Sequence, residues 1–402
     1  MNAFSKWRAD RSPRRLQIFV HDLGATGVVR NAIALANEAS ASGYQVRLLT
    51  CNADGVLRDQ VGPAVAIVKL NGPGDTGVSR RGELKRALIA YRRHSRDWAP
   101  DIMVSAGNHG HLLSSLAWLG LPGVKLLRVS NDLAHGSPPL TVRLWRAAKF
   151  RAMAWLADQL VYVSRAQAKD PLLAGQLALG RASVIANGVD LDLVRTGAEE
   201  ECDHPWANDP AVPLILAIGR HVAQKNFPTL LRAFARARAA RPMRLLFIGD
   251  GKAAEIERLR QLAEELGVGR DVALVAPVGN PFPYMKAARA FALPSLWEGS
   301  ANVLLEAMAC GTPVIASRTA GDADHVLGNG DYGMLVDPRA VDDIAHALLV
   351  QTGPDALAPA SRAASFSRAQ AMRQYIRLFD ALLEARRGRA GALSQPSAMS
   401  RA

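Results

Sequence analysis

The chain has 402 residues, of which 49% are hydrophobic, and its mean hydropathy of +0.02 is typical of a globular protein with two or three domains and a large core. Its longest apolar runs, such as Pro213–Ile218, fall far short of the ~18 residues that a membrane-spanning helix needs, and three scattered cysteines without a CxxC pair argue against a disulfide framework or a zinc site. The net charge of +13 is concentrated in residues 1–200, which hold 26 basic and 16 acidic residues, so an anionic surface or a phosphorylated substrate is favoured as a partner.

A composition rich in Arg and Ala is the other explanation of this charge. No helix-turn-helix, zinc-finger or RNA-binding signature accompanies it, so no nucleic-acid partner is expected. Residues 1–15 are basic, but no apolar signal core follows them, which predicts a cytoplasmic protein.

From residue 16 onward, short apolar and β-branched runs alternate with segments of helical period, which is the pattern of a parallel doubly wound sheet. The strands expected in this half are Leu16–Val20, Gln45–Thr50, Val65–Leu70, Asp101–Ser105, Lys125–Val129, Gln159–Val163 and Ala182–Ile185. The helices expected are Val28–Ser40, which follows a tight loop at Gly24–Gly27, then Glu83–His94 and Thr141–Leu160.

The acidic segment Thr196–Pro213 contains three prolines and is interpreted as a linker, after which the alternation restarts. The strands expected next are Leu214–Ile218, Arg244–Ile248, Val272–Val275, Ala290–Leu293 and Pro313–Ala316. The helices are Pro228–Ala240, Ala253–Leu266, Asn302–Cys310, Val341–Leu349 and Ala364–Ala385. We therefore expect Rossmann-like domains at 1–195 and 196–363, a helix at 364–388 that crosses back to the first domain, and a disordered tail at 389–402.

The strongest functional signal runs through Trp297–Pro313. Glu298 stands in a loop before the helix, and Glu306 follows inside the helix after seven intervening residues. The junction presents free backbone N–H groups near Val303 and Leu304 and the positive end of a helix dipole, which suit a phosphate. Carboxylates on either side can accept hydrogen bonds from sugar hydroxyls. A capped amphipathic helix is the plainer interpretation, but it does not explain the whole run.

A second signal is the loop Ile218–Asn226, directly after the first strand of the second unit. It carries Arg220 and Lys225 at the carboxyl end of a strand, where open α/β sheets bind ligands. A guanidinium and an ammonium there would neutralise a diphosphate and stabilise a leaving nucleoside diphosphate.

Together these residues resemble the retaining GT-B glycosyltransferases of family 4, the glycosyl transferases group 1. Glu298 and Glu306 match the E-x7-E motif of that family, and Arg220 and Lys225 match its "GR…K" loop, with Asn226 where glycine is commonest.

Three further segments fit the resemblance, which covers about residues 182–338, whereas 16–180 match only in pattern. Gly249 and Gly251 resemble the glycine loop under the nucleotide. The other two segments are Asn187–Asp190, similar to the NGVD turn that ends the first domain, and Asn280–Met285, similar to the segment near the base.

The resemblance implies an α/β protein of GT-B fold, with two Rossmann-like doubly wound domains and a central cleft. It implies transfer of a sugar from a UDP- or GDP-sugar donor to a glycan or lipid-linked acceptor with retention of configuration, in lipopolysaccharide or other surface polysaccharide synthesis. It also implies a donor nucleotide on the second domain, an acceptor on the first, and no metal or other cofactor.

The resemblance assigns roles residue by residue. Glu298 would contact the donor sugar, Glu306 the ribose, and Arg220 and Lys225 the leaving group. No carboxylate is assigned as a nucleophile, and the donor phosphate itself would help to deprotonate the acceptor.

The first domain departs from many relatives, which carry a glycine pair followed by Ala-Glu in the first loop. Here the loop is Gly24-Ala-Thr-Gly27, and Gly24 and Gly27 are expected to line the nucleotide site. The loop is not GxGxxG and no acidic residue ends the second strand, which argues against NAD. His109 and His111 follow a strand, so we expect them to face the cleft and to position the acceptor or donate to a developing charge. His109 is the catalytic candidate of the two, and a structural role is the alternative. Ser130–Asp132 is a further cleft candidate.

Two DxD pairs occur, Asp190 with Asp192 and Asp322 with Asp324, but such pairs are common by chance, so no metal site is expected. Asp322 is expected to line the donor pocket instead.

The segment Thr141–Leu160 interleaves basic residues with two tryptophans, which suits the surface of an anionic bilayer and predicts peripheral contact with the inner face of the cell membrane. An ordinary packed helix explains the pattern equally well. The basic residues concerned are Arg143, Arg146, Lys149 and Arg151.

Two other functions remain open on the sequence. A GT-B sugar-nucleotide epimerase would need neither acceptor nor membrane. A non-catalytic partner of a second transferase would not need Glu298, Arg220, Lys225 and Glu306 to be intact.

Overall fold

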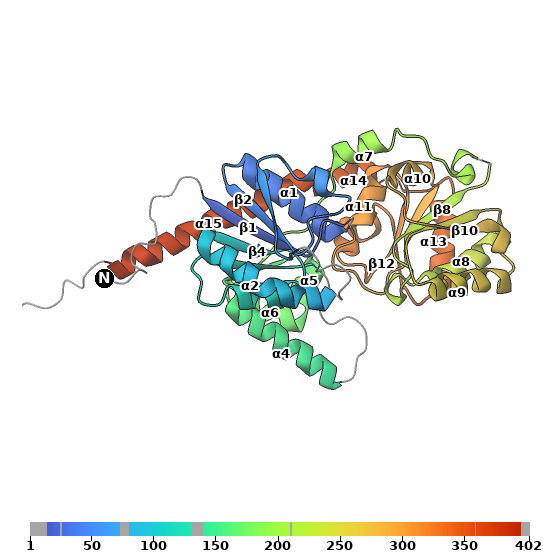
Figure 1. The fold of residues 1–402 in the computed structure, drawn as a ribbon. Helices are drawn as coiled ribbons and strands as arrows, with labels where there is room; N and C mark the ends of the chain where they lie inside the picture. The colour runs from blue at the N-terminus through green and yellow to red at the C-terminus, as the bar shows by residue number, and fades with distance from the viewer. Residues whose placement is uncertain are drawn as a thin grey trace, which may run out of the picture.

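The structure is a computed structural model that describes residues 14–24, 26–72, 80–130, 140–209, 211–357 and 359–394. It contains two sheets with helices on both faces, one in each half of the chain (Figure 1). The first sheet has the strand order β3-β2-β1-β4-β5-β6-β7 and the second the order β10-β9-β8-β11-β12-β13, and all neighbouring strands are parallel. The strand order reverses between β1 and β4 and again between β8 and β11, and ligands bind at such points in open α/β sheets.

The strands agree closely with the sequence-based expectation. The first sheet consists of β1 (Arg15–Val20), β2 (Gln45–Thr50), β3 (Val65–Lys69), β4 (Ile102–Ser105), β5 (Val124–Val129), β6 (Gln159–Tyr162) and β7 (Ala182–Val184). The second consists of β8 (Leu214–Ile218), β9 (Arg244–Ile248), β10 (Val272–Val275), β11 (Ala290–Leu293), β12 (Val314–Ser317) and β13 (Met334–Val336). Only β13 was not expected, because three residues are too few to show a period.

Helices connect the strands and cover both faces of each sheet. Those of the first half are α1 (Gly27–Ala41), α2 (Arg80–Trp98), α3 (His111–Ala117), α4 (Leu140–Leu156), α5 (Arg165–Lys169), α6 (Pro171–Ala178) and α7 (Leu191–Gly197). Those of the second half are α8 (Phe227–Ala240), α9 (Ala253–Glu265), α10 (Phe282–Ala287), α11 (Asn302–Ala309), α12 (Ala323–Val326), α13 (Val341–Gln351), α14 (Ala360–Ala363) and α15 (Arg368–Ser394). Short 3-10 turns lie at Arg58–Gln60, Pro205–Asn208, Ala223–Lys225, Gly269–Asp271, Gly328–Gly330 and Ala364–Phe366.

Three expectations need correction. Helix α4 ends at Leu156 rather than at residue 160, because Gln159 already begins β6. The expected linker 196–213 is not structureless, since α7 runs into it and a 3-10 turn lies within it. Helix α15 continues to Ser394 through a stretch rich in Arg and Ala, which favour helix, so 389–394 are helical, while 395–402 lie outside the described residues.

Helix α15 returns from the second domain to the first (Figure 1). Its backbone pairs with the interdomain segment where the N–H of Arg368 donates to the carbonyl of Val189. Five of its side chains then join the core formed by α1 and the first sheet, namely Ala371, Met372, Tyr375, Phe379 and Leu383. The C-terminal helix is therefore an integral part of the first domain.

Candidate active site

The site begins with a buried ion pair at the point where the strand order of the second sheet reverses. The Nζ atom of Lys225, after β8, lies 2.7 Å from Oε1 of Glu298, after β11, and the two side chains are only 15% and 11% exposed. The hydroxyl of Ser295 donates to the same oxygen at 2.8 Å, and Nε2 of Gln224 donates to Oε2 at 3.1 Å. Glu298 is thus held in one orientation with its charge compensated.

Glycines allow the loops around this pair to pack closely. A Cβ on Gly219 would lie 2.6 Å from Cε of Lys225, so glycine leaves room for the lysine stem. A Cβ on Gly249 would collide with the Gly219 carbonyl oxygen at 1.9 Å, and one on Gly251 would lie 2.6 Å from Cβ of His221. Gly249 and Gly251 therefore act here by bringing the ends of β8 and β9 together, a packing role that the sequence-based assignment to the nucleotide did not include.

Arg220 differs from Lys225 in its surroundings. Its side chain is exposed, and it makes no hydrogen bond or ion pair with any residue in the described part of the chain. An unpaired cation at the carboxyl end of a strand can bind an anionic ligand directly.

Glu306 on α11 is half-buried, and its carboxylate has no hydrogen-bond or ion-pair partner among the described residues. Burial raises the pKa of Glu306, although Arg30 and Arg368 oppose that effect. A carboxylate in this state can still accept hydrogen bonds from two neighbouring hydroxyls, as those of a ribose.

The N–H groups expected to hold a phosphate are not equivalent. The N–H of Leu304 donates to the carbonyl of Ala301 at 3.0 Å, so in this structure it is engaged in the first turn of α11. Val303 is the second residue of the helix, where a backbone N–H has no intrahelical acceptor.

The first domain meets the site through the N-terminus of α1. Thr26 caps this helix, its Oγ1 accepting from the N–H of Val29. A Cβ on Gly27 would lie 2.5 Å from Nδ2 of Asn302, the first residue of α11, so the N-termini of α1 and α11 approach each other across the domain boundary. Gly24 lies earlier in the same loop, where its N–H donates to the carboxylate of Asp22.

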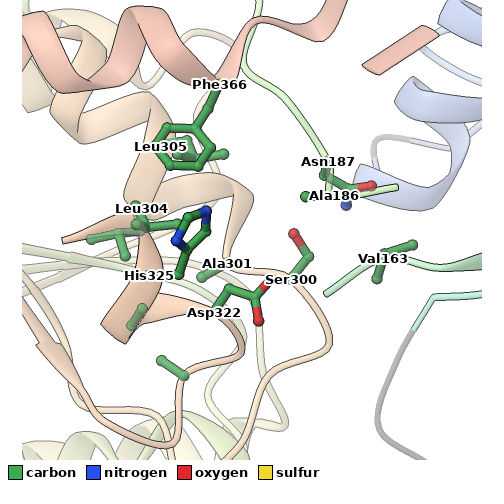
Figure 2. Close-up of a pocket in the computed structure, with 13 residues that line it drawn as sticks. Val163, Ala186, Asn187, Ser300, Ala301, Leu304, Leu305, Asp322, His325 and Phe366 are labelled. Carbon is green, nitrogen blue, oxygen red and sulfur yellow. The ribbon is translucent and has the colours of Figure 1, made fainter. Parts of the chain in front are cut away.

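A second interdomain contact is made by Asp322, which is 8% exposed. Its two carboxylate oxygens accept the backbone N–H groups of Arg165 at 2.6 Å and Ala166 at 2.7 Å, at the start of α5. Figure 2 shows Asp322 and Ser300 on loops of the second domain, opposite the first-domain segments that carry Val163 and Asn187. These residues line a small hollow at the domain boundary, with a cavity volume of about 20 Å³. Asp322 therefore lines the interdomain cleft, but its carboxylate binds the first domain.

The two histidines expected at the cleft are separated by the fold. His109 is exposed in the loop between β4 and α3. His111 is 1% exposed, its Nδ1 is 2.8 Å from the hydroxyl of Ser105, and burial lowers its pKa to about 3. His111 is thus a neutral core residue, which corrects the expectation that it faces the cleft. Ser130 is bonded to Asn108, while 131 and 132 lie outside the described residues.

The acidic pairs considered as metal ligands have other partners. Asp190 caps α7 by accepting the N–H of Leu193, and Asp322 accepts the two N–H groups of α5. Within the described ranges, no group of three or more His, Cys, Asp or Glu side chains is arranged to hold a metal ion.

Helix α4 carries large apolar side chains on its surface. Trp145 is 64% and Trp155 76% exposed, and Nζ of Lys149 lies 5.3 Å from the centre of the Trp145 ring. The helix stands at the edge of the first domain (Figure 1). Further exposed apolar residues lie on α4 and on the neighbouring α2 and α3 segment, namely Leu140, Leu144, Ile89, Leu112, Leu116 and Leu119. No helix in the part of the chain that the structure describes is long and apolar enough to cross a membrane.

One buried residue was missed by the sequence analysis. Arg128 is 3% exposed on β5, and its guanidinium donates to Tyr375, Ala106 and Asn187. The sequence did contain a signal, since Arg128 is the one charged residue in the otherwise apolar segment 126–129.

The chain has two facing Rossmann-like domains. Two cationic residues, Arg220 and Lys225, and two carboxylates, Glu298 and Glu306, lie near the point where the strand order of the second sheet reverses. This combination defines a GT-B glycosyltransferase. Two family models match the chain, Glycosyltransferase Family 4 over residues 25–193 and Glycosyl transferases group 1 over residues 212–350. The chain belongs to this family of glycosyltransferases, which confirms the resemblance and the fold class inferred from the sequence.

Individual relatives extend this result. The chain is 23% identical over 362 residues to the N-acetylgalactosamine-N,N'-diacetylbacillosaminyl-diphospho-undecaprenol 4-alpha-N-acetylgalactosaminyltransferase of Campylobacter jejuni, covering 89% of this chain and 95% of that protein. It is 32% identical over 154 residues to the lipopolysaccharide core biosynthesis glycosyltransferase LpsE of Rhizobium meliloti, covering 38% of this chain and 44% of that protein. The structure of HepE from Anabaena in complex with UDP and glucose has the same fold, with a TM-score of 0.73 at 16% identity, covering 92% of this chain and all of that one.

Proposed function

We propose that this glycosyltransferase moves a sugar from a UDP-sugar to a hydroxyl of a lipid-linked glycan, with retention of configuration, in the synthesis of lipopolysaccharide or a related surface polysaccharide. The observation that carries the proposal is the set Arg220, Lys225, Glu298 and Glu306, placed on the loops and helix at one edge of the second sheet. Similarity to the Campylobacter undecaprenol-linked transferase supports the lipid-linked acceptor, and similarity to the Rhizobium lipopolysaccharide core transferase supports the pathway class. The UDP bound to the Anabaena protein supports UDP as the nucleotide of the donor.

In the proposed reaction, the bond between the anomeric carbon and the phosphate oxygen breaks, and negative charge develops on the departing UDP. Arg220 stabilises that charge directly, and Lys225 contributes from its place beside Glu298. Glu306 binds the ribose hydroxyls and Glu298 the hydroxyls of the sugar. The acceptor oxygen bonds to the anomeric carbon on the same face, and its proton passes to a phosphate oxygen of UDP.

The surface of the first domain supports an acceptor at a membrane. The exposed tryptophans of α4 lie among Arg146, Lys149 and Arg151, a combination that suits the headgroup region of an anionic bilayer. We propose that the enzyme works as a peripheral protein on the inner face of the cell membrane.

We also propose that no metal ion takes part, because Arg220 and Lys225 supply the positive charge that a metal would otherwise provide at the diphosphate. Activity should survive treatment with EDTA. Complete loss that Mn²⁺ or Mg²⁺ restores would refute this part of the proposal.

The donor is tested by the rise in melting temperature with a panel of UDP- and GDP-sugars, since a ligand that binds the native state stabilises it. The acceptor is tested by incubating the stabilising donor with undecaprenyl-diphosphate-linked saccharides, and NMR of the product gives the anomeric configuration. An inverted product would refute retention. Conversion of the sugar nucleotide to its epimer without any acceptor would refute transfer and show an epimerase.

A further inference from the structure

Arg128 carries a buried charge that no carboxylate neutralises within the described ranges. Its Nε donates to the hydroxyl of Tyr375 at 3.1 Å, Nη1 to the carbonyl of Ala106 at 3.2 Å, and Nη2 to Oδ1 of Asn187 at 2.5 Å. A buried cation held only by neutral groups is costly compared with a paired one. Such a residue needs an explanation beyond packing.

The guanidinium determines which way the next two side chains point. Arginine has donors and no acceptor, so the oxygen of Asn187 must face Arg128 and its NH₂ group must face away. That group, Nδ2, donates to Oδ1 of Asn302 at 3.0 Å. Since the oxygen of Asn302 is thereby fixed, its own NH₂ group must point to the opposite side.

That opposite side is the place where the N-termini of α1 and α11 meet. Nδ2 of Asn302 would lie 2.5 Å from a Cβ on Gly27, the first residue of α1. Nδ2 of Asn302 has no hydrogen-bond acceptor among the residues that the structure describes. Both helices direct the positive ends of their dipoles to this region, so an unused N–H donor there adds to a site for an anion.

We propose that Asn302 donates a hydrogen bond from Nδ2 to the diphosphate of the bound sugar nucleotide. Arg128 acts through Asn187 as the residue that positions the Asn302 amide. The inference rests on the proposed function, because it takes the sugar nucleotide as the ligand of the cleft. This series of hydrogen bonds begins on β5 of the first domain and ends on α11 of the second. The NH₂ group of Asn302 therefore faces the diphosphate only when the two domains are in contact.

The substitution Asn187→Asp tests the orientation with little change of shape. A carboxylate at 187 accepts from Arg128 as before, but it also repels Oδ1 of Asn302. The Asn302 amide then rotates, its NH₂ group turns to residue 187, and its oxygen faces the phosphate. We expect UDP binding, measured by calorimetry, to weaken by about tenfold, the scale of one hydrogen bond to a charged group. The melting temperature should rise, because Arg128 gains an anionic partner.

Asn302→Ala completes a double-mutant cycle. It removes the donor, so it should weaken UDP binding to a similar extent, and Asn187→Asp should have no further effect when added to it. Arg128→Met should lower the affinity for UDP in the same way, because Asn187 is then free to rotate. Unchanged UDP binding by Asn187→Asp, or full additivity of the two substitutions, overturns the inference while leaving the proposed function intact. Wild-type protein that binds no UDP overturns the proposed function itself. A lower melting temperature of Asn187→Asp refutes the coupling to Arg128.

Discussion

Lys225 and Glu298 neutralise each other before any ligand is present, with their charged atoms 2.7 Å apart. The geometry makes each residue a support for the other, so the ammonium of Lys225 is fixed in place and Glu298 cannot repel an incoming diphosphate. Removal of either partner leaves an uncompensated charge in a largely buried position, which is costly. The effects of substituting these two residues should therefore not be independent.

Lys225→Ala should lower kcat by about 100-fold or more, the scale of a lost electrostatic contact to a developing charge, and Arg220→Ala should do the same. Initial rates at saturating donor measure the effect. Lys252→Ala is the matched control, because Lys252 is an exposed lysine on a neighbouring loop. Near-normal turnover in both the Lys225 and the Arg220 variants would refute their assignment to the leaving group.

The two carboxylates should separate binding from turnover. Glu306→Gln should weaken the binding of free UDP by about tenfold, because an amide cannot accept hydrogen bonds from both ribose hydroxyls as a carboxylate does. Glu298→Gln should spare UDP binding and lower kcat, because UDP lacks the sugar that Glu298 contacts. Calorimetry and steady-state kinetics on the two variants decide the matter, and the reverse pattern would exchange the roles.

UDP affinity should depend on pH through Glu306. Burial raises the pKa of this carboxyl, so it takes up a proton at a higher pH than an ordinary glutamate does. The ionised form is the better acceptor, so affinity is present above this pKa and lost as the pH falls through it. Calorimetry over a series of pH values that descends from neutral should show a loss of affinity in the wild type that exceeds the loss in Glu306→Gln. Because UDP itself titrates, with a phosphate pKa of about 6, comparing the two proteins cancels the contribution of the ligand. Parallel curves for the two proteins would contradict the prediction.

The first domain should bind anionic vesicles at low salt, release them at high salt, and ignore neutral vesicles, because each Lys or Arg near the surface contributes about 1 kcal/mol and salt screens the attraction. Binding should be lost when the four basic residues of α4 become Gln, namely Arg143, Arg146, Lys149 and Arg151. A control with the same charge change in the second domain should bind normally, and it replaces Arg232, Arg236, Arg258 and Arg260. Wild-type protein that stays in solution with anionic vesicles would indicate an ordinary surface helix.

Asp322→Asn should loosen the contact between the domains. An amide cannot accept both N–H groups at the start of α5, and loss of such a cap costs about 1 kcal/mol. We expect a lower melting temperature and a larger radius of gyration in X-ray scattering. Asp324→Asn is the control, because Asp324 accepts the N–H of the adjacent His325 within its own domain. Identical scattering from both variants would show that Asp322 does not hold the domains together.

The sheets could be predicted almost fully from the sequence, because buried parallel strands such as Leu214–Ile218 are unbroken apolar runs with clear ends. Glu298 and Glu306 could be found from the run Trp297–Pro313, in which one carboxylate precedes a helix and the other lies inside it, as in the E-x7-E motif. The ion pair of Glu298 with Lys225 could not, since it joins residues 73 positions apart whose distance depends on the order of the strands.

Contacts between the domains could not be predicted from the sequence for the same reason. Asp322 and Arg165 are 157 positions apart, and the role of Asp322 depends on how one domain rests on the other. His111 was placed in the cleft because it follows a strand, but it is the first residue of α3 and its side chain is buried in the core, where it contacts Ser105. Periodicity describes each element and not the angle at which two domains meet.

The return of α15 has a consequence for how the protein is made. The first domain leaves the ribosome long before Tyr375 and Phe379 are synthesised, yet both side chains belong to its core. Until translation is complete, the nascent domain has an open apolar face over α1, where chaperones can bind. A truncated protein that contains the first domain without α15 would leave that face permanently uncovered. The first domain should therefore be produced and crystallised together with α15.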